Sequence, residues 1–328
     1  MNLLADRLGG RGKRRAQSRA VFLRRNGPII MVYAFILLLV IIGITQSERF
    51  FTERNLTNVA RQSAFLGIVA LGQMLVILTA GIDLSVGSLV KVSILVSAIV
   101  MNGESANVLP AIIATLGLGV LVGLIHGFLI NELRIAPFIV TLASLVILRG
   151  IGLTISSSPV GKASREVMMF YVQKIGPVPI IAWMFFLLIV LTMLLLRFTV
   201  FGKYLYAVGG NIEVARLSGV PIKAVRYGVY VLCSLTAAVT GLLWLSRMGV
   251  GDPAIGDGIE LQTITAVIIG GTSLFGGRAS VLGTLGGVLL LGLTANLLVM
   301  LGVNQFIQGL IQGVIIVAAV ALYKQEGD

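Results

Sequence analysis

The sequence predicts an all-α polytopic membrane protein with about ten transmembrane helices. Three observations lead to this prediction: 57% of the 328 residues are hydrophobic, only 12% are charged, and the mean hydropathy is +1.02. A soluble domain carries about 25% charged residues, and a helix needs about 20 mostly apolar residues to cross a bilayer. The composition therefore excludes a cytosolic enzyme, a disulfide scaffold and a disordered chain.

A basic segment opens the chain and sets its orientation. Eight Lys and Arg residues precede residue 26, opposed only by Asp6, immediately ahead of an apolar run over 28–44. This pattern is typical of a cytoplasmic tail beside an anionic membrane surface. The apolar run is longer than the core of a signal peptide and lacks a small-residue cleavage site, so we expect a retained anchor. The net charge of +12 then marks a membrane face rather than a nucleic-acid partner.

Apolar windows separated by charged or Gly/Pro-rich breaks predict ten spans. They cover residues 28–46, 58–80, 84–101, 109–131, 137–155, 179–197, 223–246, 261–275, 281–300 and 304–323. An even number of spans returns the C-terminus to the cytoplasm. We therefore expect two cytoplasmic tails, 1–27 and 324–328, around a transmembrane domain over 28–323. With this topology the cytoplasmic segments hold more Lys and Arg than the outer segments, as the positive-inside rule requires.

Two connections are too long to be simple turns. The segment 156–179 contains three prolines and is predicted to lie outside, and the segment 197–226 is predicted to lie inside. The other connections are short and leave no room for a soluble domain.

Two Gly-rich stretches resemble each other: GIDLSVGS at 81–88 and GGTSLFGG at 270–277. Repeats of this kind are common in transporters. The similarity indicates either an internal duplication or a chance likeness between two turns.

Asp83 is the one acid between two long apolar runs. Since an Asp at a helix centre costs about 3 kcal/mol on insertion scales, we expect Asp83 at a helix break beside Gly81. There it either caps the following helix through that helix's free N–H groups or takes part in a pathway or gate.

The inside loop contains a short helix with its own start and stop signals. Asn211 is placed to cap the N-terminus, and Glu213 complements the positive end of the helix dipole. Gly219 can end the helix in the left-handed conformation, and Pro221 prevents its continuation. Such a helix either lies on the membrane surface or binds a cytoplasmic partner.

A family resemblance appears at this helix. Glu213-Val214-Ala215, followed three residues later by Gly219, resembles the E-A-A-x-x-x-G coupling motif of permease subunits in ATP-binding-cassette importers, with Val at the second position. The stretches FFTERNLTNVARQ, LTAGIDLSVGS, FIVTLASLVILRG and AVIIGGTSLFGGRAS resemble the ribose/xylose/arabinose/galactoside branch of these permeases. The resemblance covers about residues 48–323.

The resemblance implies a ten-helix permease domain of the inner membrane that imports a sugar or sugar-like solute. It implies a dimer with an identical or paralogous second permease, two ABC ATPase subunits that bind the loop at 197–226, and an extracytoplasmic sugar-binding protein. The residues it assigns to ATPase coupling are Asn211, Glu213, Ala215, Arg216 and Gly219.

The sequence contains no G-x-x-x-x-G-K-S/T phosphate loop. ATP must therefore be hydrolysed by a partner, and we expect neither an enzymatic activity nor a cofactor in this chain. The single His and the single Cys also leave no metal cluster. The alternative function is a secondary transporter or facilitator that needs no ATPase.

Further candidates for the pathway lie in the spans. Asn304, Gln308 and Gln312 recur every fourth residue, so they share one helix face. That face either lines an aqueous path or bonds between helices. Arg149 must find water, a carboxylate or a backbone carbonyl, so it either lines the outer mouth or anchors the outer loop. The glycines at 119, 123 and 127 predict close helix contact.

Overall fold

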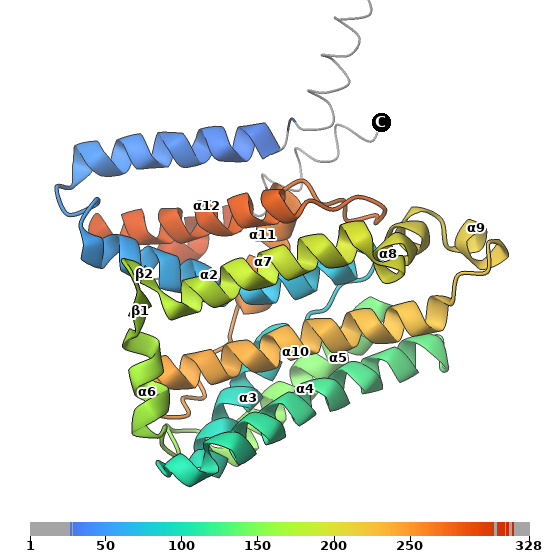
Figure 1. Cartoon of the computed structure of the whole chain (residues 1–328), viewed down its shortest axis with the longest axis horizontal. Helices are drawn as coiled ribbons and strands as arrows, with labels where there is room; N and C mark the ends of the chain where they lie inside the picture. The colour runs from blue at the N-terminus through green and yellow to red at the C-terminus, as the bar shows by residue number, and fades with distance from the viewer. Residues whose placement is uncertain (1–26, 28, 305–306, 312, 315–316, 318–328) are drawn as a thin grey trace, which may run out of the picture.

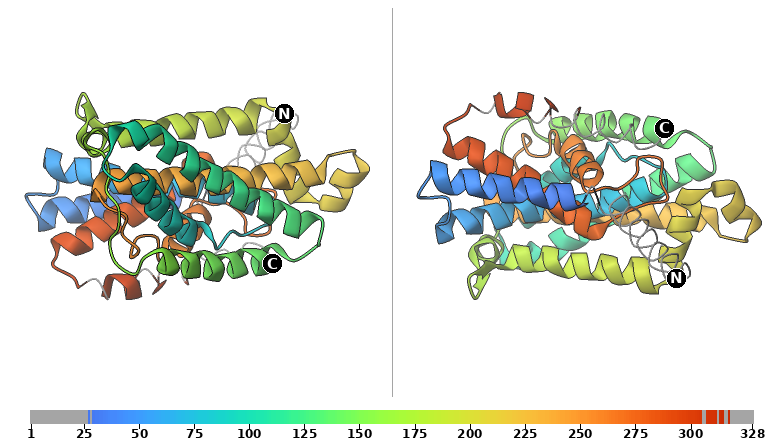
Figure 2. Two further views of the ribbon diagram at one scale, coloured as in Figure 1. Left: turned by 90° about the horizontal axis from the view of Figure 1, so that it is seen from below. Right: turned by 90° about the horizontal axis from the view of Figure 1, so that it is seen from above.

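The computed structural model describes residues 27, 29–304, 307–311, 313, 314 and 317, and helices dominate this part of the chain. The long helices run along one common direction in Figure 1 and in the views from below and above in Figure 2. After a first helix, Ile29–Gln46, the membrane helices are α2 Glu53–Leu78, α3 Val86–Met101, α4 Val108–Asn131, α5 Pro137–Ile155, α7 Ile180–Phe198, α10 Ile222–Met248, α11 Ile259–Ile269 and α12 Val281–Met300.

Seven of the described helices are long and apolar enough to cross a membrane, which confirms an all-α polytopic protein. The helices at 86–101 and 259–269 are apolar but shorter. The tenth expected span, 304–323, lies mostly outside the described residues. The tail 324–328 and all of the basic tail 1–27 except Gly27 also lie outside them. The count of ten spans and the positions of both termini therefore stay predictions.

The eighth expected span is much shorter than the sequence indicates. Hydropathy predicts a helix over 261–275, but α11 has 11 residues and ends at Ile269. Gly271 follows with φ of +87°, and the two glycines at 276 and 277 also have positive φ. The run of glycines therefore forms a loop, and α11 extends only about 16 Å at 1.5 Å per residue, roughly half of the ~30 Å hydrocarbon core.

Both short helices follow the same arrangement. Each is preceded by a long helix and by a segment that turns back into the bundle: α2 and 79–85 precede α3, and α10 and 249–258 precede α11. The two return segments start from opposite ends of the molecule (Figure 1). The Gly-rich stretches compared above occupy different places in this arrangement, since 81–88 leads into α3 whereas 270–277 follows α11. An internal duplication stays a prediction.

The two long connections are folded. The outer one contains helix α6 Arg165–Val172 and a two-residue hairpin, β1 Lys174–Ile175 and β2 Val178–Pro179. The inner one contains α8 Val200–Gly210 and α9 Ile212–Leu217. The outer loop and α9 lie at opposite ends of the molecule (Figure 1). A 3₁₀ turn, η1 Ser105–Asn107, joins α3 to α4, and the Ser105 hydroxyl donates to Glu166 of α6 at 2.7 Å.

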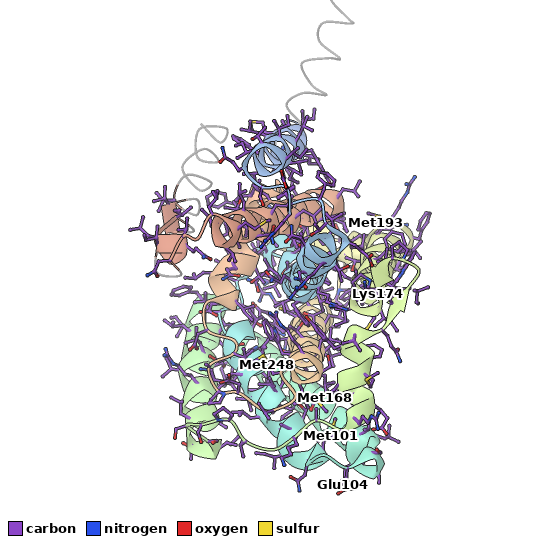
Figure 3. All side chains as sticks on the ribbon, turned by 90° about the vertical axis from the view of Figure 1, so that its left-hand side faces the viewer. Met101, Glu104, Met168, Lys174, Met193 and Met248 are labelled. Carbon is purple, nitrogen blue, oxygen red and sulfur yellow. The ribbon has the colours of Figure 1, made fainter. Side chains whose placement is uncertain are left out.

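Stacked aromatic rings attach α6 to the core. Phe65 of α2 stacks on Tyr171 of α6 on one side and on Trp244 of α10 on the other, at 6.4 and 4.8 Å between centroids. Two arginines close the stack, with Arg61 over Tyr171 at 4.5 Å and Arg247 over Trp244 at 4.8 Å. Figure 3 looks onto this end of the molecule. Cation–π contacts and ring stacking are strongest when desolvated, so this stack fixes the outer loop on α2 and α10.

The predicted glycine contact between helices is confirmed for α4. A Cβ atom on Gly119 would lie 3.1 Å from the Ser234 carbonyl oxygen, and one on Gly123 would lie 2.5 Å from the Val231 Cα of α10. The backbones of α4 and α10 therefore touch, which in lipid supplies the van der Waals contact that drives helix association.

This contact predicts a position-dependent cost of added volume. Gly123→Ala has to push α10 away from α4, so we expect the variant to lose about 1–3 kcal/mol of stability and to unfold at a lower temperature in detergent. Gly117→Ala is the control, because no described atom outside its own helix lies within 4 Å of the added Cβ. Equal unfolding temperatures for the two variants would contradict the close packing.

Candidate functional site

Helix α9 begins with the predicted cap. The Asn211 side-chain oxygen accepts from the backbone N–H groups of Glu213 and Val214, at 3.0 and 3.1 Å. Asn211 itself is extended, with φ of −160° and ψ of 111°. Two of the N–H groups that a helix leaves unpaired at its start are thus satisfied by one side chain.

The end of α9 is equally well defined. Gly219 has φ of +76°, its N–H donates to the Arg216 carbonyl, and the Val220 N–H donates to the Ala215 carbonyl, both at 3.0 Å. These two bonds form a Schellman motif, which needs a left-handed residue at Gly219. The sequence prediction of a complete helix with Asn211 at its start and Gly219 at its end is therefore confirmed.

The side chains of α9 divide into an inner and an outer set. Ala215 is buried and anchors the helix, whereas Val214 and Leu217 are exposed, Leu217 to 88%. The ion pair between Arg216 and Glu213 spans 3.4 Å on the exposed side, where such pairs add little stability. The helix therefore exposes apolar and charged groups at one end of the molecule.

Behind α9, three backbone segments meet at glycines. The Gly277 N–H donates to the Leu78 carbonyl at the end of α2, at 3.0 Å. A Cβ atom on Gly209, near the end of α8, would overlap that same carbonyl oxygen and lie 2.6 Å from the Gly277 nitrogen. A Cβ atom on Gly276 would in turn lie 2.8 Å from the Gly209 carbonyl oxygen. This glycine junction brings the element next to α9 against the loops that follow α2 and α11.

Asp83 lies at the helix break, as predicted, but does not cap α3. Its Oδ1 accepts from the Ser85 N–H at 2.9 Å and from the Ser85 hydroxyl at 2.6 Å, and α3 begins at Val86. Because Ser85 lies before the helix, Asp83 stabilises the turn that leads into α3. The other oxygen, Oδ2, lies 3.7 Å from Nδ1 of the buried His126, whose Nε2 lies 2.9 Å from the Ser144 hydroxyl. A pathway or gating role of Asp83 stays a prediction.

The other predicted pathway residues belong to separate groups. Arg149 is exposed on α5 and lies close enough to Glu260 of α11 to interact with it electrostatically. The Gln308 amide donates to the Val303 carbonyl at 2.8 Å, and the Gln308 N–H to the Asn304 carbonyl at 3.0 Å, so the Gln308 side chain bonds to the start of its own helix. Gln312 lies outside the described residues.

Two charged residues that the sequence analysis did not select form an ion pair. The Lys91 ammonium of α3 lies 2.9 Å from Asp257, with 2% and 52% of the two side chains exposed. Lys91 is a cation within the apolar run that forms α3, which is a recognisable signal for function in a membrane. Its partner follows 166 residues later, and that pairing has no local sequence signal.

The apolar helices, their two breaks and the projecting α9 together define a multi-pass membrane protein built for transport. Residues 55–320 match the family described as "Branched-chain amino acid transport system / permease component". The chain belongs to this family of permeases.

Curated relatives agree with this assignment over nearly their whole lengths. The ribose import permease protein RbsC of Escherichia coli K12 is 38% identical over 294 residues, 88% of this chain and 91% of the relative. The probable ABC transporter permease protein YphD of the same strain is 36% identical over 91% and 90% of the two chains. The fructose import permease protein FrcC of Rhizobium meliloti is 33% identical over 92% and 86%. No solved structure matches the chain.

The resemblance noted from the sequence is thereby confirmed. The chain is the permease component of an ATP-binding-cassette importer and a multi-pass protein of the inner membrane.

The glycine junction predicts different effects for two neighbouring residues. Gly209→Ala has to break or lengthen the bond from the Gly277 N–H to Leu78, so we expect hydrogen exchange at the Gly277 amide to be about tenfold faster or more. Gly210→Ala is the control, because no described atom lies within 4 Å of its added Cβ. Hydrogen exchange with mass spectrometry of peptides spanning 270–280 measures both, and equal exchange in the two variants would contradict the junction.

Proposed function

We propose that this chain forms the translocation pathway of an ATP-driven importer for a sugar or sugar-like solute, and that it works as a dimer. The observation that carries this proposal is α9, a capped helix that projects from the inner end with Leu217 88% exposed. An isolated two-turn helix is not stable in water, so the caps at Asn211 and Gly219 maintain a shape for a partner. That partner is the ABC ATPase.

The contact between α9 and the ATPase transmits the energy of ATP binding to the permease. The sequence has no phosphate loop, so ATP binding takes place in the partner and moves α9. Because α9 follows α8 and precedes α10, its movement shifts the bundle between an outward-open and an inward-open state. The residues that contact the ATPase are Asn211, Glu213, Arg216 and the exposed apolar pair on α9, while Ala215 and Gly219 hold the helix in shape.

The outer end supports a second partner. A recess of about 370 Å³ lies at the start of α2, lined by Glu53, Arg54, Thr57, Asn58, Arg61 and Lys174. Glu53, the only acid of this lining, forms an ion pair with Lys174 at 2.8 Å. The two arginines therefore give the recess a net positive charge. A positive recess of this kind fits an acidic surface of the extracytoplasmic binding protein that delivers the solute.

The names of the relatives favour a sugar as the solute. Two relatives that match most of this chain are called ribose and fructose import permeases, although the family description names branched-chain amino acids. Uptake of D-ribose by the chain, its ATPase and its binding protein in proteoliposomes tests the proposal. We expect uptake that requires ATP and both partners.

A secondary transporter or facilitator is the alternative, and one observation favours testing it. The structure brings Asp257 and Glu260 into the region of the buried Lys91, and an ion-coupled transporter needs ionisable groups at membrane depth. This alternative predicts gradient-driven uptake by the purified chain alone in liposomes. Uptake under that condition would overturn the requirement for an ATPase.

The docking role of α9 predicts an effect of Leu217 that depends on polarity. Leu217→Asp places a charge where we expect an apolar contact, so the affinity for the ATPase should fall by about 2 kcal/mol, and ATP-driven uptake should fall with it. Leu217→Met keeps the apolar contact and is the matched control. Co-purification of the ATPase and uptake in vesicles measure both effects. Unchanged association of Leu217→Asp would show that α9 is not the docking element.

A further inference from the structure

The two short helices begin at the same place inside the bundle. Gly87 lies in the first turn of α3, and a Cβ atom there would overlap both the Gly256 carbonyl oxygen and the Glu260 carboxylate at the start of α11. A Cβ atom on Gly256 would lie 3.1 Å from the backbone nitrogen of Lys91. The N-terminal ends of α3 and α11 are therefore in direct contact, although each follows a different return segment.

Four charged groups surround this meeting point. Lys91 is buried and paired with Asp257 at 2.9 Å, and about half of the Asp257 side chain is exposed. Glu260 follows one turn later, against Gly87. Arg149 of α5 is exposed, and Gly152, one turn further along α5, packs against the Lys91 side chain, because a Cβ atom on Gly152 would lie 3.2 Å from Lys91 Cδ.

These charges lie at membrane depth. Lys91 is ten residues before the outer end of α3 at Met101, a distance of about 15 Å along the helix, which is half of the ~30 Å hydrocarbon core. A charged side chain at this depth is unfavourable unless it faces water or a partner. The exposed parts of Asp257 and Arg149 therefore face an aqueous space and not lipid.

The charge balance indicates which solute fits there. Lys91 and Arg149 donate hydrogen bonds, Asp257 and Glu260 accept them, and the four formal charges cancel. An anion would be repelled by the two carboxylates, and a cation would be repelled by Lys91 and Arg149. A neutral solute with several hydroxyl groups both donates and accepts, so it can bond to both kinds of group without a net charge penalty.

We propose that Lys91, Arg149, Asp257 and Glu260 form a solute-binding subsite for a neutral polyhydroxylated molecule, where the short helices α3 and α11 meet. The inference rests on the proposed sugar import and names the residues that contact the sugar on its way. In many secondary transporters, substrates bind where interrupted helices meet near the bilayer midplane. When no sugar is bound, the ion pair with Asp257 compensates the buried charge of Lys91.

Cysteine accessibility tests the subsite. The native Cys233 is fully buried and is replaced by Ala, after which Asp257→Cys or Arg149→Cys supplies the only thiol of this chain, and labelling is read on this chain alone. The complete transporter in proteoliposomes is treated with a charged, water-soluble thiosulfonate, with and without D-ribose. We expect both thiols to react and D-ribose to slow both reactions. Arg149→Cys keeps the test valid if loss of the Lys91 partner prevents Asp257→Cys from folding.

Two positions serve as controls for this labelling. Leu187→Cys lies among exposed apolar residues of α7, so we expect it to face lipid and not to react. Asp252→Cys lies in the same return segment as Asp257, outside the four-residue cluster, so it should react without protection by D-ribose. Failure of both cluster thiols to react, or reaction without protection, would overturn the subsite.

A second measurement separates binding from a structural role. In the Arg149→Cys background, Asp257→Asn keeps the side-chain shape but removes a charged acceptor, so the D-ribose concentration that gives half-protection should rise about tenfold or more. Asp252→Asn should leave that concentration unchanged. Equal half-protection in the two variants would overturn the role of Asp257 in binding. If the unmodified transporter shows no ATP-dependent uptake of D-ribose, the proposed function itself is rejected.

Discussion

The structure depends on one constraint: in hydrocarbon, every backbone N–H and C=O group must find its partner within the protein. A helix can therefore be interrupted only where other elements surround the break. The break between α2 and α3 is satisfied in this way. The Thr141 hydroxyl of α5 donates to the Ile82 carbonyl at 3.0 Å. The Gln73 side-chain amide, oriented with its nitrogen toward the Asp83 carbonyl, donates to that carbonyl and accepts from the Asp83 N–H. The helices packed around this break are therefore needed to satisfy the backbone groups that the break leaves without helical partners.

The same constraint links the two ends of the molecule. Because α3 and α11 are short, their N-terminal ends meet inside the bundle, and the end of α2 and the loop after α11 meet α8 at the glycine junction next to α9. Backbone contacts therefore connect α8, which leads into α9, with the segments on either side of the short helices. Helix interruption thus places polar groups within the bundle and also brings their flanking segments against the element next to α9.

Local features were predictable from the sequence, and distant pairings were not. Asn211, Gly219 and Pro221 specify α9 because capping depends on residues within one or two turns. The length of α11 was overestimated because hydropathy cannot separate a helix from an apolar Gly-rich loop. The Lys91–Asp257 pair and the difference between Gly209 and Gly210 depend on which backbones meet, and the spacing of residues in one segment contains no such information. Asp83 was placed correctly at a break, but its bonds to Ser85 follow from the path of the turn.

The bond from the Gly277 N–H to the Leu78 carbonyl also has a consequence for biosynthesis. Leu78 is synthesised long before Gly277, so its carbonyl has no Gly277 partner until most of the chain has been made. The aromatic stack closes earlier, as soon as Trp244 and Arg247 of α10 have been made. The outer end therefore begins to assemble during synthesis, but it is also completed late, because Asn55 at the start of α2 bonds to Asn296 of α12. The order of translation thus leaves a hydrogen bond open at each end of α2 until most of the chain has been made.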